Sequence, residues 1–78
     1  MWFDTKKVEE NNDVVIYEYG FESHDLTGKL SLSKRDGIVA LINKDANYDE
    51  NRFKWIAARV RHFFPEENYP DKRMFATG

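Results

Sequence analysis

The chain has 78 residues, a formal net charge of −2, 41% hydrophobic and 15% aromatic residues, and no cysteine. A chain of this length forms one domain, here residues 1–78, and its hydrophobic content argues against intrinsic disorder. The absence of cysteine excludes disulfide frameworks, zinc sites built from thiolates, and thiol catalysis.

The start of the chain carries no sign of a membrane or export segment. Residues 1–6 lack the basic start and the apolar run of a secretory signal. No apolar run in the chain approaches the ~18 residues of a membrane span. We therefore expect a soluble, cytoplasmic protein that does not contact a membrane.

Two strands are predicted at the start of the chain. Residues 2–8 mix aromatic residues, Thr and Lys, and the polar run 9–13 favours a turn between them and residues 14–22. Residues 14–22 alternate between two faces, and one of these faces is expected to meet a helix. That face carries Val15, Tyr17, Tyr19 and Phe21.

Two further strands are predicted in the middle of the chain. Residues 29–33 alternate, with both leucines pointing inward and the polar side chains outward. The Asp36-Gly37 pair predicts a hairpin, because both positions tolerate a positive φ. It leads into residues 38–42, whose continuous apolarity leaves open which side chains face the helix.

The only sustained helical periodicity lies in residues 50–64, which we predict as one amphipathic helix. Asp49 is a suitable N-cap, because its carboxylate can accept hydrogen bonds from the free amides of the first turn. Tyr48 can pack on Phe53 as a hydrophobic staple. Pro65 is expected to end the helix.

The apolar side chains of this helix form one arc, which is expected to cover the aromatic face of the sheet. Burying a large side chain there stabilises the fold by roughly 1.5–3 kcal/mol before entropy is subtracted. The predicted core comprises Tyr17, Tyr19, Phe21, Leu30, Leu32, Phe53, Ile56, Val60 and Phe64.

Residues 66–71 are predicted as a loop, and residues 72–76 as a short fifth strand along an edge of the sheet. The expected fold class is therefore α+β. It consists of an antiparallel four-stranded meander, a fifth C-terminal edge strand, and one amphipathic helix packed on one face. Small folds of this kind serve many functions, so the fold by itself does not identify one.

Charge is unevenly distributed along the chain. Residues 1–50 carry six Lys or Arg against eleven Asp or Glu, residues 51–64 carry four Lys or Arg and no acid, and residues 65–78 carry two against three. The helix is therefore the basic element of an acidic protein. A basic helix can face a polyanion, or its cations can pair with acidic groups of its own sheet or of a second copy.

Trp55 lies opposite the apolar arc on the helical wheel and therefore needs a covering group. Arg52, Arg59 and His62 flank it. In one alternative, the C-terminal segment 69–75 folds over the indole and an arginine stacks on it. In the other, a partner protein covers it, and Trp55, Arg52, Arg59 and His62 form the binding site.

The sequence contains no catalytic, cofactor or metal motif. His24 and His62 are its only imidazole ligands, and no cluster of ligands surrounds either one. The adjacent His24 and Asp25 are more typical of a loop turn than of a catalytic pair. The four glycines are too scattered for a phosphate-binding loop. We predict that the protein is not an enzyme and holds no metal or cofactor.

The sheet face away from the helix is expected to carry a second apolar patch. It would combine Ile16 and one parity of residues 38, 40 and 42 with Trp2 or Phe3. Such a patch favours burial, either under the C-terminal segment or under a second copy. Two-fold homodimers are the commonest form of self-association, so a homodimer is predicted.

These features favour three functions, in the following order. The first is a small non-enzymatic protein-interaction module, such as an inhibitor or immunity-type partner protein, acting through Trp55 and its neighbours or through the outer sheet face. The second is nucleic-acid binding through the basic face of helix 50–64, against which the acidity of the rest of the chain counts. The third is a small-molecule or catalytic site near His24 and Asp25.

Overall fold

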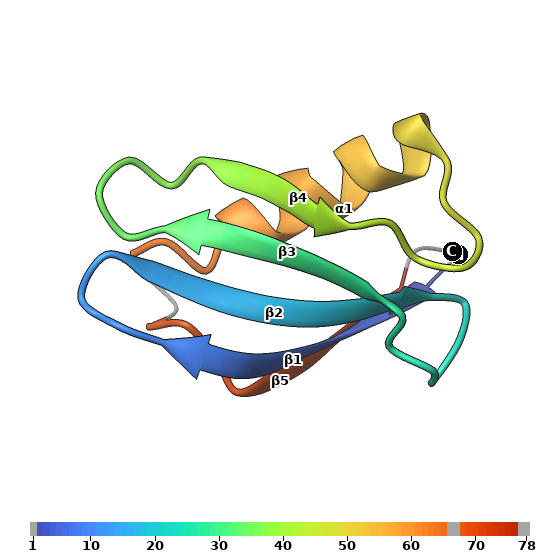
Figure 1. Ribbon diagram of the computed structural model, residues 1–78, viewed down its shortest axis with the longest axis horizontal. Helices are drawn as coiled ribbons and strands as arrows, with labels where there is room; N and C mark the ends of the chain where they lie inside the picture. Colours follow the sequence, from blue (N-terminus) through green and yellow to red (C-terminus); the bar gives the residue numbers. More distant parts are fainter. Residues whose placement is uncertain (1, 66–67, 77–78) are drawn as a thin grey trace.

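The computed structural model describes residues 2–65 and 68–76 and confirms the predicted α+β fold. Its elements are β1 (Trp2–Glu10), β2 (Val14–Phe21), β3 (Gly28–Ser33), β4 (Val39–Asn43), α1 (Glu50–Arg61) and β5 (Lys72–Ala76). The strands form one sheet in the order β4-β3-β2-β1-β5, and each neighbouring pair is antiparallel (Figure 1). Within these ranges, no helix is long and apolar enough to cross a membrane.

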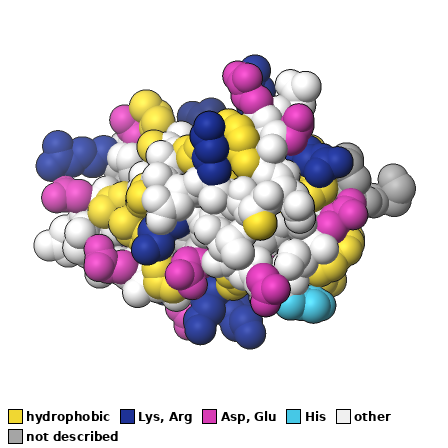
Figure 2. All heavy atoms as spheres, turned by 45° about the vertical axis from the view of Figure 1, so that its right-hand side comes forward, with side chains coloured by type: hydrophobic (Ala, Val, Ile, Leu, Met, Phe, Trp, Pro, Cys, Tyr) yellow, Lys and Arg dark blue, Asp and Glu magenta, His cyan; other side chains and the backbone are white. Residues whose placement is uncertain are grey.

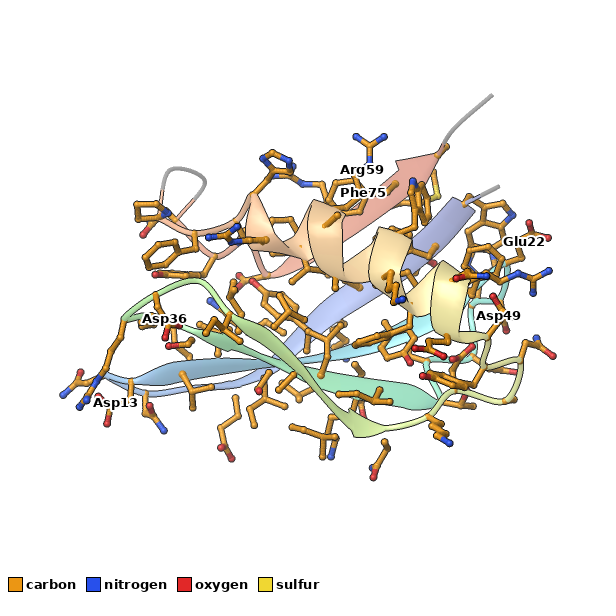
Figure 3. The ribbon with its side chains drawn as sticks, turned by 90° about the horizontal axis from the view of Figure 1, so that it is seen from above. Asp13, Glu22, Asp36, Asp49, Arg59 and Phe75 are labelled. Atoms are coloured by element: carbon orange, nitrogen blue, oxygen red, sulfur yellow. The ribbon has the colours of Figure 1, made fainter. Side chains whose placement is uncertain are left out.

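The sheet is coiled, and α1 lies against its concave inner side. In Figure 1 the helix is behind the sheet and crosses behind β4, while β5 comes round behind β1. Seen from above in Figure 3, β5 and the start of β1 lie on one side of α1, and β3 and β4 lie on the other. The sheet therefore reaches round both flanks of the helix.

The C-terminal strand is fixed by its pairing with β1 and by a hydrogen bond from β2. Lys72–Ala76 pairs with Trp2–Lys6 in antiparallel register, which confirms the predicted edge strand. The Tyr17 hydroxyl donates a hydrogen bond of 2.8 Å to the Pro70 carbonyl just before this strand. The C-terminal segment therefore lies within the sheet and does not cover its outer face.

The β3–β4 turn differs from the predicted two-residue hairpin, because Gly37 alone of its pair has a positive φ, of 75°. The Asp36 carboxylate accepts a hydrogen bond of 3.0 Å from the Ile38 amide. A Cβ at Gly37 would also lie 2.7 Å from Phe64 Cδ1, so both conformation and space require glycine there. In consequence β4 begins at Val39, one residue later than predicted.

Pairing with β3 decides the facing of β4, which the sequence left open. Val39 and Leu41 lie opposite the two leucines of β3 and pack against the core. Ala40 lies opposite Ser31 and faces outward. A bulge follows at Ile42, where β4 has one residue more than β3.

The predicted start of the helix is confirmed in both of its details. The Asp49 carboxylate accepts a hydrogen bond of 3.1 Å from the Arg52 amide, as an N-cap does. The rings of Tyr48 and Phe53 lie 6.3 Å apart between centroids, which is the arrangement of a hydrophobic staple. These two local contacts set where the chain enters α1.

The helix ends at Arg61 with His62 as C-cap, three residues before the predicted end. The next two amides bond to carbonyls three residues back, Phe63 to Val60 at 2.9 Å and Phe64 to Arg61 at 3.0 Å. Such a 3₁₀ turn advances about 120° per residue instead of about 100°. It moves Phe63 toward the centre of the core and Phe64 toward its edge.

The core follows the prediction with one correction. Phe63, which the predicted core omits, is fully buried, whereas Phe64 is half-buried and packs against the core. Phe53 packs at the core margin. The buried apolar residues are Phe3, Val15, Tyr17, Tyr19, Phe21, Leu30, Leu32, Ile56, Val60 and Phe63.

Both buried tyrosines find acceptors for their hydroxyl groups. Tyr17 bonds to the Pro70 carbonyl, and Tyr19 donates to Asp45 Oδ1 at 3.1 Å. Burial raises the pKa of each phenol above its usual value of 10.0. No buried side-chain nitrogen or oxygen in the described ranges lacks a hydrogen-bond partner.

The outer face of the sheet keeps part of the predicted apolar patch. Trp2 is on this face, whereas Phe3 belongs to the core. Ile16 lies opposite Ser31 on this face and is half-buried. Among the described residues, the exposed large apolar side chains are Val8 (44%), Ile38 (61%), Ile42 (46%) and Met74 (58%).

Candidate functional site

The side chain of Trp55 packs against the sheet. Its indole meets the ring of Phe3 edge-on at a centroid distance of 5.0 Å and that of Phe21 at 6.2 Å, and the residue is half-buried. The Arg59 guanidinium lies 5.7 Å from the indole centroid. Phe75 stacks on Phe3 at 4.9 Å, so the C-terminal strand supports this contact indirectly. The arginine expected over Trp55 is therefore present, but the rings that cover the indole are Phe3 and Phe21 of the sheet. Segment 69–75, which was expected to fold over the indole, instead leads into β5 and pairs with β1.

The other three residues predicted to bind a partner lie along the same flank of α1. Arg52 Cζ is 4.8 Å from the centroid of Phe21, and Arg59 lies over Trp55. His62 caps the helix one turn beyond Arg59. All three polar residues are exposed. The flank thus presents cations and an imidazole to solvent, but only part of the indole.

The basic side chains of α1 do not form one patch. On a helical wheel with Phe53 at zero, Lys54 and Arg61 fall at about 90° and Arg52 and Arg59 at about 250°. Arg52 and Arg59 flank Trp55, whereas Lys54 and Arg61 line a groove beside β4. On the face shown in Figure 2, acidic and basic side chains are interspersed. A polyanion approaching the helix would therefore meet its cations in two separate pairs.

His24 is paired with Asp4 of β1. Its Nδ1 lies 2.9 Å from Asp4 Oδ2, and its ring lies 5.0 Å from that of Trp2. The loop that carries it folds back over β2 at Gly20, where a Cβ would lie 2.6 Å from the Asp25 carbonyl oxygen. The structure therefore joins His24 to a carboxylate twenty residues away, and not to the adjacent one.

An open hollow of about 590 Å³ lies beside this pair, over β1 and β5. The His24 side chain is 83% exposed, and Thr5, another residue of the lining, is buried and donates its hydroxyl to the Arg73 carbonyl at 2.8 Å. Catalysis by a nucleophile needs a group activated by a base and sheltered from water. The described residues also contain no group of three His, Cys, Asp or Glu side chains suited to a metal ion.

The two edges of the sheet differ in their protection against pairing with another strand. The β5 edge begins with Lys72 and Arg73, and charged side chains discourage such pairing. The β4 edge, Val39–Asn43, has no charged residue and no proline. Apolar side chains border it, since Ile38 is 61% and Ile42 46% exposed. The protective features that β4 itself carries are its short length and the bulge.

The free edge of β4 offers backbone groups for a further strand. The Ser33 amide donates a hydrogen bond of 2.9 Å to the Ile38 carbonyl. Bonded and non-bonded pairs alternate in an antiparallel ladder, so Ile38 and Ala40 bond to β3. Val39 and Leu41 therefore direct their N–H and C=O groups away from β3, and no strand of the described chain follows on that side.

A groove of about 420 Å³ runs between this edge and α1. On the helix side, Ala57 and Ala58 line it, with Lys54 before them and Arg61 after them in the sequence. Because the alanines are small, the groove has room for side chains from an added strand. The helix crosses behind β4 in Figure 1, so a strand added along the free edge of β4 would have part of α1 against its inner face.

A charged cluster at the opposite end of β1 is part of the scaffold. The Glu10 carboxylate lies 2.6 Å from Lys34 Nζ and 2.7 Å from Lys7 Nζ, and Lys7 lies 2.9 Å from Asp71. Hydrogen bonds from Lys34 and Lys7 lower the pKa of Glu10 to about 2. Hydrogen bonds to Glu10 and Asp71 raise the pKa of Lys7. The cluster joins β1, the β3–β4 turn and the start of β5.

Sequence reasoning missed the β4 groove and the pairing of His24 with Asp4. Asp4 lies opposite Gly20 in the sheet, and only strand register reveals the space that the loop fills. A signal for the edge was present in the sequence, because residues 39–43 carry no charge whereas 72–73 carry two. The missing charge indicates an unprotected edge only once residues 39–43 are known to form an edge strand.

No family model, no curated protein and no solved structure matches this chain. The comparisons therefore contribute neither a family nor a function.

Proposed function

We propose that this chain is a small, non-enzymatic protein-interaction module that binds its partner by accepting an additional strand at the free edge of β4. The observation that carries the proposal is the uncharged edge Val39–Asn43, bordered by a groove beneath α1. Strand addition is a recurrent mode of peptide recognition in which the main chain supplies affinity and alternate side chains supply specificity.

The backbone chemistry of the edge supports this mode of binding. Val39 and Leu41 supply two N–H and two C=O groups that water must otherwise satisfy. Each main-chain hydrogen bond to an added strand contributes about 0.5–1.5 kcal/mol net. The bulge at Ile42 ends the regular part of the edge, so the bound segment is short and binding is expected to be reversible.

Partner binding through Trp55 with Arg52, Arg59 and His62 ranks second. To become a hot spot, the indole would have to exchange its contacts with Phe3 for contacts with a partner. Strand addition at β4 requires no such rearrangement of the core. The edge is therefore the better-supported surface.

A selection with randomised linear peptides displayed on phage tests the proposal, because it finds binding sequences directly and needs no identified partner. Enriched peptides are titrated into isotopically labelled protein, and the amides of Val39 and Leu41 are expected to shift. Val39→Lys places a charge on the inner side of the edge and should abolish binding. Met74→Lys adds the same side chain to an exposed position of the other edge strand and is the control for the added charge.

Thermal unfolding shows whether both variants fold. Peptides that bind the parent and Met74→Lys but not Val39→Lys support the proposal. It is overturned if selection enriches no peptide, or if the enriched peptides shift amides elsewhere and bind Val39→Lys as tightly as the parent.

A further inference from the structure

The groove beside β4 has a basic lining. It contains the side chains of Lys54 and Arg61 and no acidic side chain. The two cations are seven residues apart on α1, which is about 10 Å along the helix axis. A strand lying in the groove would therefore run past two positive charges on the side that faces the helix.

The period of a strand divides the side chains of an added segment between two environments. Alternate residues point to opposite faces, and residues on the same face recur about every 7 Å. Side chains on the inner face would meet Ala57, Ala58 and the two cations of the groove. Side chains on the outer face would lie beside Ala40 and Ile42, which are exposed.

We infer that the strand bound at β4 is an extended segment of a partner protein in which acidic residues face α1 and apolar residues lie beside Ala40 and Ile42. This inference rests on the proposed strand addition and names the chemistry of the partner. Charge complementarity selects acidic side chains on the inner face. The exposed apolar side chains at the edge select apolar ones on the outer face.

Two carboxylates near the groove limit the size of the effect. Lys54 Nζ lies 3.7 Å from Glu50, in a pair whose side chains are 70% and 74% exposed, and such pairs are weak and easily exchanged. Asp36 in the β3–β4 turn lies near Arg61, and its carboxylate already accepts the Ile38 amide. Both cations therefore remain accessible to a bound carboxylate.

Three synthetic peptides of one pattern test the inference. The acidic peptide is Val-Glu-Ile-Ala-Ile-Glu-Val, and its controls carry Gln or Lys in place of both Glu residues. Two exposed ion pairs should make the acidic peptide bind about three- to tenfold more tightly than the Gln peptide at low salt, with less advantage at high salt. The Lys peptide should bind most weakly of the three.

A pair of double variants on α1 assigns the preference to the groove. Lys54→Gln with Arg61→Gln removes both groove cations, and the acidic peptide should then bind as the Gln peptide does. Arg52→Gln with Arg59→Gln removes the same charge from the opposite flank and should leave the preference intact. All four residues are exposed, so both double variants are expected to fold.

The possible results separate this inference from the proposed function. If the Gln peptide shifts the Val39 and Leu41 amides and the acidic peptide gains nothing, strand addition stands and the acidic pattern is refuted. The pattern is also refuted if both double variants reduce the preference equally, because net charge would then explain it. If no peptide shifts those amides, both proposals fall.

Discussion

The ring of Tyr19 covers Gly28 on the neighbouring strand. The two residues lie directly opposite each other in the β2–β3 ladder, and a Cβ at residue 28 would sit 2.3 Å from Tyr19 Cζ. An aromatic ring that covers a glycine compensates for the missing side chain and shields the strand backbone. The same ring is held at its far end by the hydrogen bond from its hydroxyl to Asp45.

Replacing Gly28 with alanine is expected to destabilise the fold by about 1–3 kcal/mol, because the added methyl forces the fully buried Tyr19 ring from its position. Urea unfolding measures the change. Ser31→Ala, on the outer face of the same strand, should stay within about 0.5 kcal/mol of the parent. A Gly28→Ala protein as stable as the parent would show that the ring has room to move.

The two phenylalanines that follow α1 should differ sharply in their contributions to stability. Phe63→Ala removes a fully buried ring and is expected to cost about 3–5 kcal/mol, whereas Phe64→Ala, at a half-buried site, should cost less. Thermal and urea unfolding measure which variant is less stable. If Phe63→Ala does not fold at all while Phe64→Ala does, Phe63→Ala is likewise the more destabilising change. The reverse ranking would contradict the 3₁₀ turn.

Stability is expected to depend on Glu10 in acid. Its pKa in the folded protein is about 2, below the ordinary 4.5, because Lys34 and Lys7 donate hydrogen bonds to the carboxylate. The contribution of Glu10 to the stability of the folded protein is complete above about pH 4.5 and is lost as the pH falls toward about 2. Glu10→Gln should therefore lower the melting temperature near neutral pH. The gap between the melting temperatures of the variant and the parent should shrink as the pH falls through this range.

Glu9→Gln provides the control for this titration, since it removes a neighbouring negative charge that forms no ion pair within the described residues. Melting temperatures of the three proteins are compared at each pH. A difference between Glu10→Gln and the parent that stays constant down to pH 2 would disprove the role assigned to the cluster.

Nucleic-acid binding through α1 is expected to be absent at micromolar concentration. The helix carries only four cations, which lie on two flanks, and residues 1–50 and 65–78 are net acidic. Short single- and double-stranded oligonucleotides are titrated at low and moderate salt, with Trp55→Phe assigning the fluorescence signal against Trp2. Salt-sensitive binding with a slope of about 0.7–0.9 per phosphate, lost on Arg52→Ala with Arg59→Ala, would reverse this ranking.

Self-association is predicted through the outer sheet face and not through β4. Two copies joined at β4 would set their α1 helices against each other, because each helix crosses behind its own β4 (Figure 1). The exposed Val8 and Ile42 and the half-buried Ile16 leave the outer face as the surface for a second copy. Sedimentation velocity at micromolar concentrations should show a dimer, and Ile16→Lys should make it a monomer. A parent that is monomeric throughout would end this hypothesis.

Trp55 illustrates where sequence reasoning stopped. Helical periodicity placed it opposite the apolar arc, which is correct for a helix lying on a flat sheet. Coiling of the sheet brings Phe3 and Phe21 up against that flank, so the indole is half-buried. Sheet curvature arises from strand twist summed over all five strands, and no local window of sequence contains it.

By itself, the sequence determined the elements whose causes are local. Alternation in β2 and β3, the Asp49 cap and the strand at Lys72–Ala76 all follow from residues within a few positions of one another. Tertiary structure decided what depends on partners distant in sequence, including the β4 facing, the pairing of His24 with Asp4 and the groove beside β4. The reason is that the pairing of strands and the coiling of the sheet place such groups together, and no local window of sequence contains the twist summed over five strands.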